Sequence, residues 1–253
     1  MSTLMTKLAR EHSLAAILNR LVYGFSRHWL LILTLLWGLY VGLPWLAPIF
    51  RQIGWAGAGN VLYAIYSTQC HQLPERSFFL FGEKSMYSLA EVQAAWQSTN
   101  NPVILRQFVG NPQLGWKVAW SDRMVSMYTS VFIAGLLYWP LRRRLKPLSI
   151  WGFILLTLPM VIDGGTHLLS DLAGIGNGFR DSNAWLALLT GNIFSATFYA
   201  GDALGSFNSW MRLITGLLFG VGAVWLAYPY IEEAFAEATR DIEAKFHKAG
   251  LTL

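Results

Sequence analysis

The chain has 253 residues, of which 54% are hydrophobic and 13% are charged, and its formal net charge is +5. This composition is too apolar for an ordinary soluble domain. The basic residues collect near the ends of apolar runs and form no stripe, so nucleic acid is a poor partner. A single cysteine excludes an intramolecular disulfide and a thiolate cluster made by this chain alone.

The N-terminal segment, residues 1–28, places basic residues among leucines and is predicted to form a cytoplasmic amphipathic helix on the membrane. A cleaved signal peptide is the alternative, but the apolar run that follows is too long for the hydrophobic region of such a peptide. That run, Trp29 to Phe50, contains no charged residue and is the first predicted span. Four basic residues precede it and only Arg51 directly follows it, which places the N-terminus in the cytoplasm.

The next part of the chain, residues 51–123, is predicted to be an outer loop. Gly54 to Tyr66 is short for a span and fits a surface-lying or re-entrant helix. The stretch after it is mixed in polarity and punctuated by prolines, which indicates a small loop domain outside the bilayer. Within that domain, Ser88 followed by Glu91 has the capping-box spacing that begins a short helix.

The second predicted span covers residues 124–141, and a basic cluster follows it directly at 142–146. This cluster is the strongest topology signal in the chain because basic loops stay in the cytoplasm. The outer loop is therefore expected to be extracytoplasmic. The third span begins at Leu148 and returns the chain to that same outer side.

Three segments complete the chain. Residues 185–201 lack charge but contain polar side chains, so they are predicted either to span or to form a buried broken helix. Residues 213–231 are the last clear span, and 232–253 are predicted to form a solvated cytoplasmic helix. The whole chain thus predicts an all-α, polytopic membrane helix bundle of four or five spans. Its membrane domain is residues 29–231, with a small extracytoplasmic loop domain.

The third apolar run ends in ionisable residues. Asp163, His167 and Asp171 follow one another at helical spacing, so a helix aligns them on one face. Ionisable groups at such depth usually face a bundle interior or a wet cavity and mark a functional site. The alternative is that the span ends near Ile162 and that these residues lie among the lipid headgroups.

Counting along the chain predicts a partner for Asp163. The loop between the second and third spans is centred between Arg144 and Leu145. In two antiparallel helices of equal rise, Arg123 then lies at the level of residue 166. Asp163 is less than one turn deeper, so an ion pair between Arg123 and Asp163 is predicted.

Topology brings polar groups from several segments to the outer face, which is the best indication of a site. The predicted site residues are Cys70, His71, Gln72, Arg76, Asp122, Arg123, Asp163, Thr166, His167 and Asp171. The cofactor is unknown. One hypothesis is a divalent metal ion held by His71, Asp163 and His167, a nitrogen and oxygen donor set that suits zinc. The other is a buried polar network that only fixes helix packing.

Four motifs together resemble a known family: CHQLPERS at 70–77, SDRMVSMY at 121–128, PMVIDGGT at 159–166 and RDSN at 180–183. The family consists of prokaryotic multipass membrane proteins catalogued as domain of unknown function 2085. The resemblance runs from about residue 63 to 191. It implies the architecture and the location of the site, but no reaction.

The chain departs from this family in the second motif. The family usually has Cys-x-Arg-Cys followed by Gly-x-Tyr-x-Gly. Here Ser121 and Met124 occupy the cysteine places, and Ser126 and Ser130 occupy the glycine places. The thiolates of the relatives are thus absent at these positions, and the aspartate, histidine and arginine part of the site remains.

Two functional classes follow from these features. The first is an integral membrane protein of unknown activity, multi-pass in the cell membrane, with a ligand or metal site at its extracytoplasmic face. Whether that site is catalytic stays open. The alternative is a non-catalytic accessory or structural subunit of a larger membrane complex, whose partners are other membrane protein subunits as well as the lipid bilayer.

Overall fold

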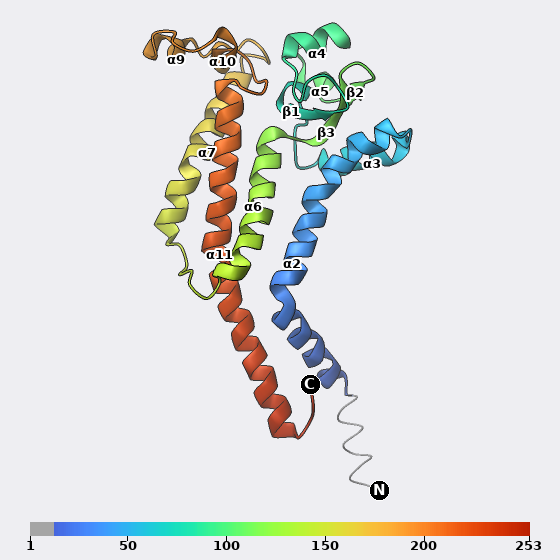
Figure 1. The fold of residues 1–253 in the computed structure, drawn as a ribbon, viewed down its shortest axis with the longest axis vertical. Helices are drawn as coiled ribbons and strands as arrows, with labels where there is room; N and C mark the ends of the chain where they lie inside the picture. The colour runs from blue at the N-terminus through green and yellow to red at the C-terminus, as the bar shows by residue number, and fades with distance from the viewer. Residues whose placement is uncertain (1–12) are drawn as a thin grey trace.

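The computed structural model describes residues 13–253, which form a bundle of long helices with a group of strands and short helices at one end (Figure 1). Four helices are long and apolar enough to cross a membrane. They are α2 (Leu14–Gln52), α6 (Asp122–Leu141), α7 (Ile150–Asp171) and α11 (Phe207–Ala249). The predicted helical membrane bundle is confirmed, with four candidate spans.

The two outermost helices are longer than predicted. Helix α2 has 39 residues and continues without a break through the boundary expected at residue 28, although Figure 1 shows that it bends. Helix α11 has 43 residues and joins the last span to the predicted C-terminal helix. It ends at Gly250, which has the left-handed φ of 64° that glycine adopts most readily at a helix end. Residues 1–12 of the predicted amphipathic segment lie outside the described residues.

The far ends of α2 and α11 pack against each other, so two side chains of the predicted C-terminal helix, Ile242 and Phe246, are buried. Ala16 of α2 forms an apolar cluster with Ile242 and Phe246 of α11. The Trp29 indole N–H donates to the Glu232 carboxylate at 2.9 Å. Burial of these side chains stabilises the contact beyond the apolar part of the bundle.

Helices α6 and α11 approach closely through small residues. A Cβ added at Gly220 would lie 1.9 Å from Ser130 Oγ and 2.6 Å from Met127 O, so no larger residue fits there without separating the helices. The Ser130 hydroxyl donates to Met127 O at 2.8 Å and to Gly216 O at 3.3 Å across the interface. Small residues on both helices therefore allow the backbones to pack, as they do in membrane helix pairs.

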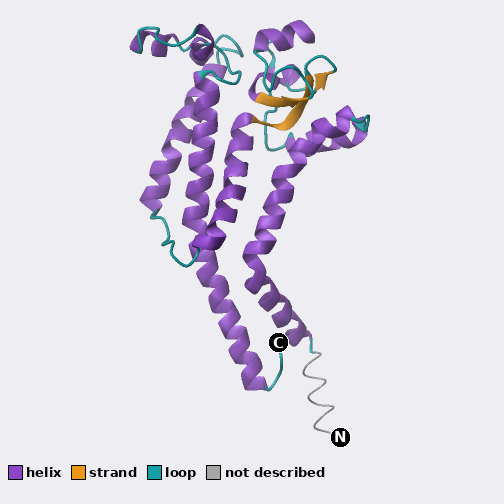
Figure 2. Ribbon diagram, in the orientation of Figure 1, coloured by secondary structure: helices purple, strands orange, loops and turns teal. Residues whose placement is uncertain are grey.

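The region between α2 and α6 forms a compact group that we call the cap, residues 67–121. Helix α3 (Ala56–Tyr66) leads into it at an angle to α2 (Figure 1). The elements of the cap are η1 (Pro74–Arg76), β1 (Ser77–Leu80), α4 (Leu89–Ala95), α5 (Pro102–Leu105), β2 (Gly110–Asn111) and β3 (Gly115–Ser121). The strands form an antiparallel sheet in the order β1-β3-β2, which the sequence did not predict (Figure 2). The predicted capping box of Ser88 and Glu91 at the start of α4 is confirmed.

An aromatic cluster joins the cap to the helices. Trp120 of β3 is fully buried, and its ring lies 5.0 Å from that of Tyr128 on α6 and 5.1 Å from that of Tyr40 on α2. The Tyr66 ring of α3 packs edge-on against Trp120 as well. Large apolar rings contribute strongly to burial and prefer such tilted contacts. The cap thus shares its core with the bundle.

Residues 185–201 do not span. They contain two short helices, α9 (Ala184–Leu189) and α10 (Ala196–Tyr199), which lie at the same end of the bundle as the cap (Figure 1). Gly191 and Asn192 both have positive φ, at 63° and 58°, so the chain turns there instead of continuing as a helix. The expectation of a fifth span or a buried broken helix is corrected, since α9 has no buried residue.

Candidate functional site

Four arginines and four aspartates meet where the cap, α6, α7 and α11 converge. The arginines are Arg76, Arg123, Arg180 and Arg212, and the aspartates are Asp122, Asp163, Asp171 and Asp202. Most are almost fully buried, and all eight are ion-paired. Because the charges balance, the group lowers the large cost of taking each ion out of water.

The first part of this network is centred on Asp163 of α7. Arg123 Nη2 lies 2.7 Å from Asp163 Oδ2, so the ion pair predicted by counting is confirmed. Arg180 of α8 (Phe179–Ser182) contacts the other oxygen at 2.6 Å. A Cβ at Gly164 would lie 2.9 Å from Arg123 Nη1, so the glycine after the aspartate leaves room for this guanidinium.

The second part is a chain of pairs from α6 to α7. Arg212 binds both oxygens of Asp122 at 2.8 Å and Asp202 Oδ1 at 2.6 Å. Arg76 Nε donates to Asp202 Oδ2 at 2.8 Å, and its two Nη atoms donate to the two oxygens of Asp171 at 2.7 Å each. Such bidentate contacts fix direction as well as distance.

For the members of the network that lie outside the spans, these ion pairs determine the pKa values. Burial by itself raises the pKa of Asp202, but the charges of Arg76 and Arg212 outweigh it and hold that pKa well below its usual range. Burial by itself lowers the pKa of Arg76, but the charges of Asp202 and Asp171 outweigh it and raise that pKa well above its usual value. Asp202 and Arg76 are therefore both ionised at neutral pH.

The other predicted site residues have different roles. Thr166 Oγ1 accepts from Arg180 Nη1 at 3.1 Å and so supports the network. Gln72 is structural, because its Nε2 donates to two backbone carbonyls, Tyr63 O and Ala119 O, at 3.0 and 2.9 Å. Cys70 Sγ accepts from the Ser121 N–H at 3.3 Å and is buried where the cap meets the helices.

Three members of the network, Arg180, Asp202 and Arg212, were absent from the predicted site residues, although Arg180 lies in the fourth motif of the family resemblance. One signal in the sequence points to Arg212. It lies at the end of the last span that is predicted to be extracytoplasmic, where the positive-inside rule disfavours an unpaired arginine. Such a residue therefore needs a buried carboxylate, and Asp202 lies ten positions earlier in the chain.

The predicted three-residue metal site is not formed. Within residues 13–253, no group of three or more His, Cys, Asp or Glu side chains is arranged to hold a metal ion. Asp163 and His167 are close, with Asp163 Oδ1 at 4.0 Å from His167 Nε2, but the Asp163 oxygens bind two arginines. The Nδ1 of His71 accepts from the Leu73 N–H at 3.1 Å. The hypothesis that His71, Asp163 and His167 converge on one ion is therefore corrected.

Beside the network lies a pocket of about 280 Å³, which we call the inner pocket. Its lining includes Cys70, His71, Arg123, Met124, His167 and Asp171. Leu168 of α7 also lines it and is 67% exposed on the apolar side of the bundle. The inner pocket therefore combines a charged floor with an apolar edge.

Comparison with known proteins supports the architecture. Residues 113–201 match the model of the family described as "Predicted membrane protein (DUF2085)". An uncharacterized protein of Methanocaldococcus jannaschii, MJ1492, is 28% identical over 184 residues, which cover 69% of this chain and 90% of that protein. No solved structure matches the chain. The matched segment includes Arg123, Asp163 and Arg180, so the centre of the network lies within it.

The first motif, at 70–77, lies outside the matched segment, whereas the other three lie inside it. The expected resemblance to this family of unknown function is thereby confirmed. The chain is a membrane protein with four candidate transmembrane helices, and its residues 113–201 are similar to the family described as "Predicted membrane protein (DUF2085)".

Proposed function

We propose that the protein is a multi-pass protein of the cell membrane whose extracytoplasmic face binds the phosphate headgroup of a lipid in the inner pocket. The observation that carries the proposal is the excess of unused hydrogen-bond donors around this pocket. A ligand that supplies acceptors and negative charge complements such a site.

His167 is one of these donors. Arg180 Nη2 lies 3.2 Å from His167 Nε2, and a guanidinium only donates, so Nε2 must be the accepting nitrogen. The proton of the neutral ring is then assigned to Nδ1. That Nδ1 is buried and has no hydrogen-bond partner in the part of the chain that the structure describes. A buried donor without an acceptor costs free energy that a bound ligand can recover.

His71 is assigned in the same way. Its Nδ1 accepts from Leu73 N–H, so its Nε2 carries the proton of the neutral ring. His71 is exposed and lines the pocket, but desolvation by the surrounding chain and the charges of Arg76 and Arg212 lower its pKa to about 3. His71 is therefore neutral at physiological pH and offers an N–H.

Arg123 supplies the positive charge. Its Nη2 is paired with Asp163, whereas its Nη1 and Nε make no hydrogen bond within residues 13–253. Asp171, the carboxylate that lines this pocket, already holds Arg76 with both oxygens. An anionic group therefore meets donors that no carboxylate of the chain occupies.

The apolar edge of the pocket favours a lipid over a free ion. Leu168 is exposed on the candidate span α7 and lines the pocket, so a headgroup could enter there while its acyl chains stay in the bilayer. The depth of the pocket also suits a lipid headgroup, because the pocket lies beside the end of α7, where this candidate span ends at Asp171.

Calorimetry on the purified protein in detergent tests the proposal with a short-chain phosphatidate, the matching diacylglycerol without phosphate, and inorganic phosphate. Phosphatidate is expected to bind and diacylglycerol is not. Arg123→Gln and His167→Phe should each weaken binding roughly tenfold, as losing a charged hydrogen bond does. Arg143→Gln, in the basic loop at the opposite end, is the matched control.

Equal binding of phosphatidate and diacylglycerol, or wild-type affinity in both pocket variants, would overturn the proposal. Equal binding of phosphatidate and inorganic phosphate would assign the site to a free anion instead of a lipid. The accessory-subunit hypothesis stays a prediction. It gains support if no phosphatidate binds and a stable assembly with other membrane proteins is recovered in mild detergent.

A further inference from the structure

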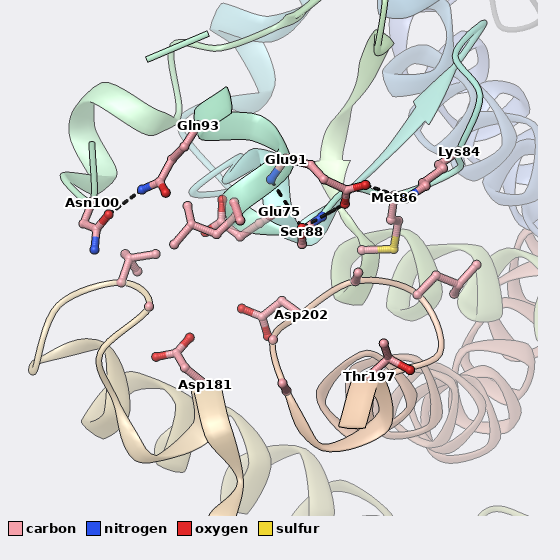
Figure 3. Close-up of a pocket in the computed structure, with 18 of the residues that line it drawn as sticks. Glu75, Lys84, Met86, Ser88, Glu91, Gln93, Asn100, Asp181, Thr197 and Asp202 are labelled. Atoms are coloured by element: carbon pink, nitrogen blue, oxygen red, sulfur yellow. Dashed lines mark hydrogen bonds and ion pairs between the residues drawn. The ribbon is translucent and has the colours of Figure 1, made fainter. Parts of the chain in front are cut away.

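A second and larger cavity, of about 750 Å³, opens between the cap and the loops around α8 and α10; we call it the outer cavity (Figure 3). Helix α4 and η1 line it on the cap side, and Asp181 and Asp202 line it on the other. The ion pair of Arg76 and Asp202 separates the two sites, because Arg76 lines the inner pocket and Asp202 lines the outer cavity.

The outer cavity is strongly acidic although the whole chain is basic. Its lining holds four carboxylates, Glu75, Glu91, Asp181 and Asp202, and one cationic side chain, Lys84. Lys84 is already paired with Glu91, and Asp202 is neutralised by Arg76 and Arg212. Glu75 and Asp181 form no ion pair with any described residue, although the charges of Arg76 and Lys117 lie near Glu75.

Glu75 is the more unusual of the two. Its side chain is 2% exposed, and neither carboxylate oxygen has a hydrogen-bond partner in residues 13–253. The neighbouring Arg76 spends its guanidinium on Asp171 and Asp202. A buried carboxylate normally has a partner, because leaving it unpaired costs several kcal/mol. The missing partner is a hydrogen-bond donor, preferably a cationic one.

Asp181 adds a second free acceptor. Its Oδ2 accepts from Gly178 N–H at 2.8 Å and begins α8, whereas its Oδ1 makes no hydrogen bond to any described residue. Partial burial raises the pKa of Asp181, and burial raises that of Glu75 to about 7. In both cases burial is the largest cause and outweighs nearby positive charge, which is that of Arg76 and Lys117 for Glu75 and that of Arg76 for Asp181.

The chemistry of the cavity indicates an organic cation and not a metal ion. No three acidic, histidine or cysteine side chains of the described chain converge closely enough to share a metal. An ammonium group needs only one or two carboxylates, since it donates three hydrogen bonds. The remaining walls are largely apolar and include Met86, Leu89, Ile175 and Leu204, which can enclose a hydrocarbon chain.

We propose that the outer cavity is a binding site for an organic amine, with the ammonium group accepted by Glu75 and Asp181 and an aliphatic body packed against the apolar walls. The site is separate from the inner pocket and opposite to it in charge. The protein would then recognise an anionic group at the membrane level and a cationic group at the aqueous end of the same bundle.

Calorimetry on the full chain in detergent tests this with hexylamine as the probe, and with hexanol and hexanoate of the same chain length. Hexylamine is expected to bind, and the neutral and anionic analogues are not. Glu75→Gln should lower the affinity for hexylamine roughly tenfold or more, as expected for loss of a charged partner. Asp181→Asn, which keeps an oxygen to cap α8, should lower it as well.

Glu83→Gln is the matched control, because Glu83 is an exposed glutamate of the cap that does not line the outer cavity. It should bind hexylamine like the wild type. The proposal is overturned if hexylamine and hexanol bind equally, or if Glu75→Gln and Asp181→Asn both retain wild-type affinity. Because replacing Glu75 removes an unpaired buried charge, a loss of binding in that variant is not expected to come from unfolding.

Discussion

Arg123 at the start of α6 and Asp163 near the end of α7 form an ion pair with 2.7 Å between Nη2 and Oδ2. The pair crosses two helices that are joined only by the short basic loop after α6. Asp163 also holds Arg180, so it is the shared acceptor of two arginines. Loss of Asp163 would therefore leave two arginines without this acceptor, whereas loss of Arg123 would leave Asp163 paired with Arg180.

Removing Asp163 should therefore be the more damaging change. Asp163→Ala leaves two buried arginines without their carboxylate and is expected to destabilise by about 3–5 kcal/mol. Arg123→Ala should cost less, because Asp163 keeps Arg180 and the Arg123 side chain is 18% exposed. Unfolding in mixed detergent measures both, and the double variant should be less destabilised than the sum of the singles. Strict additivity would show that the two groups do not interact.

Glu75 should make stability depend on pH. Its pKa rises from 4.5 to about 7 in the folded chain because of burial. At pH values between these two, the carboxyl group is therefore ionised in the unfolded chain and protonated in the folded one. Stability is then lost as pH rises from 4.5 to 7, and Glu75→Gln escapes this loss. The free energy of unfolding of the variant, relative to that of the wild type, should be about 3 kcal/mol larger at pH 8 than at pH 4.

The charged groups that face Glu75, namely Arg76, Asp202 and Lys117, are present in both proteins. Burial lowers the pKa of Lys117 to about 7 while the charge of Glu75 raises it, so the pH-dependent difference between the two proteins reports Glu75 together with this coupling. Thermal unfolding of the two proteins at pH 4 and pH 8 measures the difference. If the gap in Tm between variant and wild type is the same at both values, Glu75 does not titrate as described.

The contact between α6 and α11 depends on Gly220. Gly220→Ala places a Cβ 1.9 Å from Ser130 Oγ and 2.6 Å from the Met127 carbonyl oxygen, so the helices must separate. The expected loss is about 1–3 kcal/mol, as for other overpacked interfaces. Gly24→Ala is the control, since a Cβ there meets nothing within 4 Å and alanine favours the helix. Unfolding of both variants in detergent tests this, and equal stability of the two would contradict it.

The orientation in the membrane is tested by labelling with an impermeant thiol reagent in intact cells. Cys70 is buried, so the test uses Cys70→Ser as the background. Ser98→Cys in the cap should react, because Ser98 is exposed and the basic loop is expected on the cytoplasmic side. Arg143→Cys in that loop should react only after the membrane is opened. The reverse pattern would show that the cap faces the cytoplasm.

Much of the architecture could be predicted because its signals are local. The length of each apolar run defines a span, and Ser88 and Glu91 define the start of α4 through contacts three residues apart. The pair of Arg123 and Asp163 was also predictable, because a short loop fixes the relative depth of two antiparallel helices. In each case the decisive geometry is contained in a helix or in one helix–loop–helix unit.

Tertiary structure decided the rest. Arg76 meets Asp202 from 126 positions away, and no periodicity in the chain specifies such a contact. The same holds for Lys117, which is fully buried because the cap folds around β3. Sequence by itself determined a helical membrane protein of four or five spans with charges at one end, since hydropathy and spacing act over one helix. Which arginine each aspartate holds, and which carboxylate is left unpaired, depends on how distant segments pack, because burial and charge pairing are properties of the assembled fold.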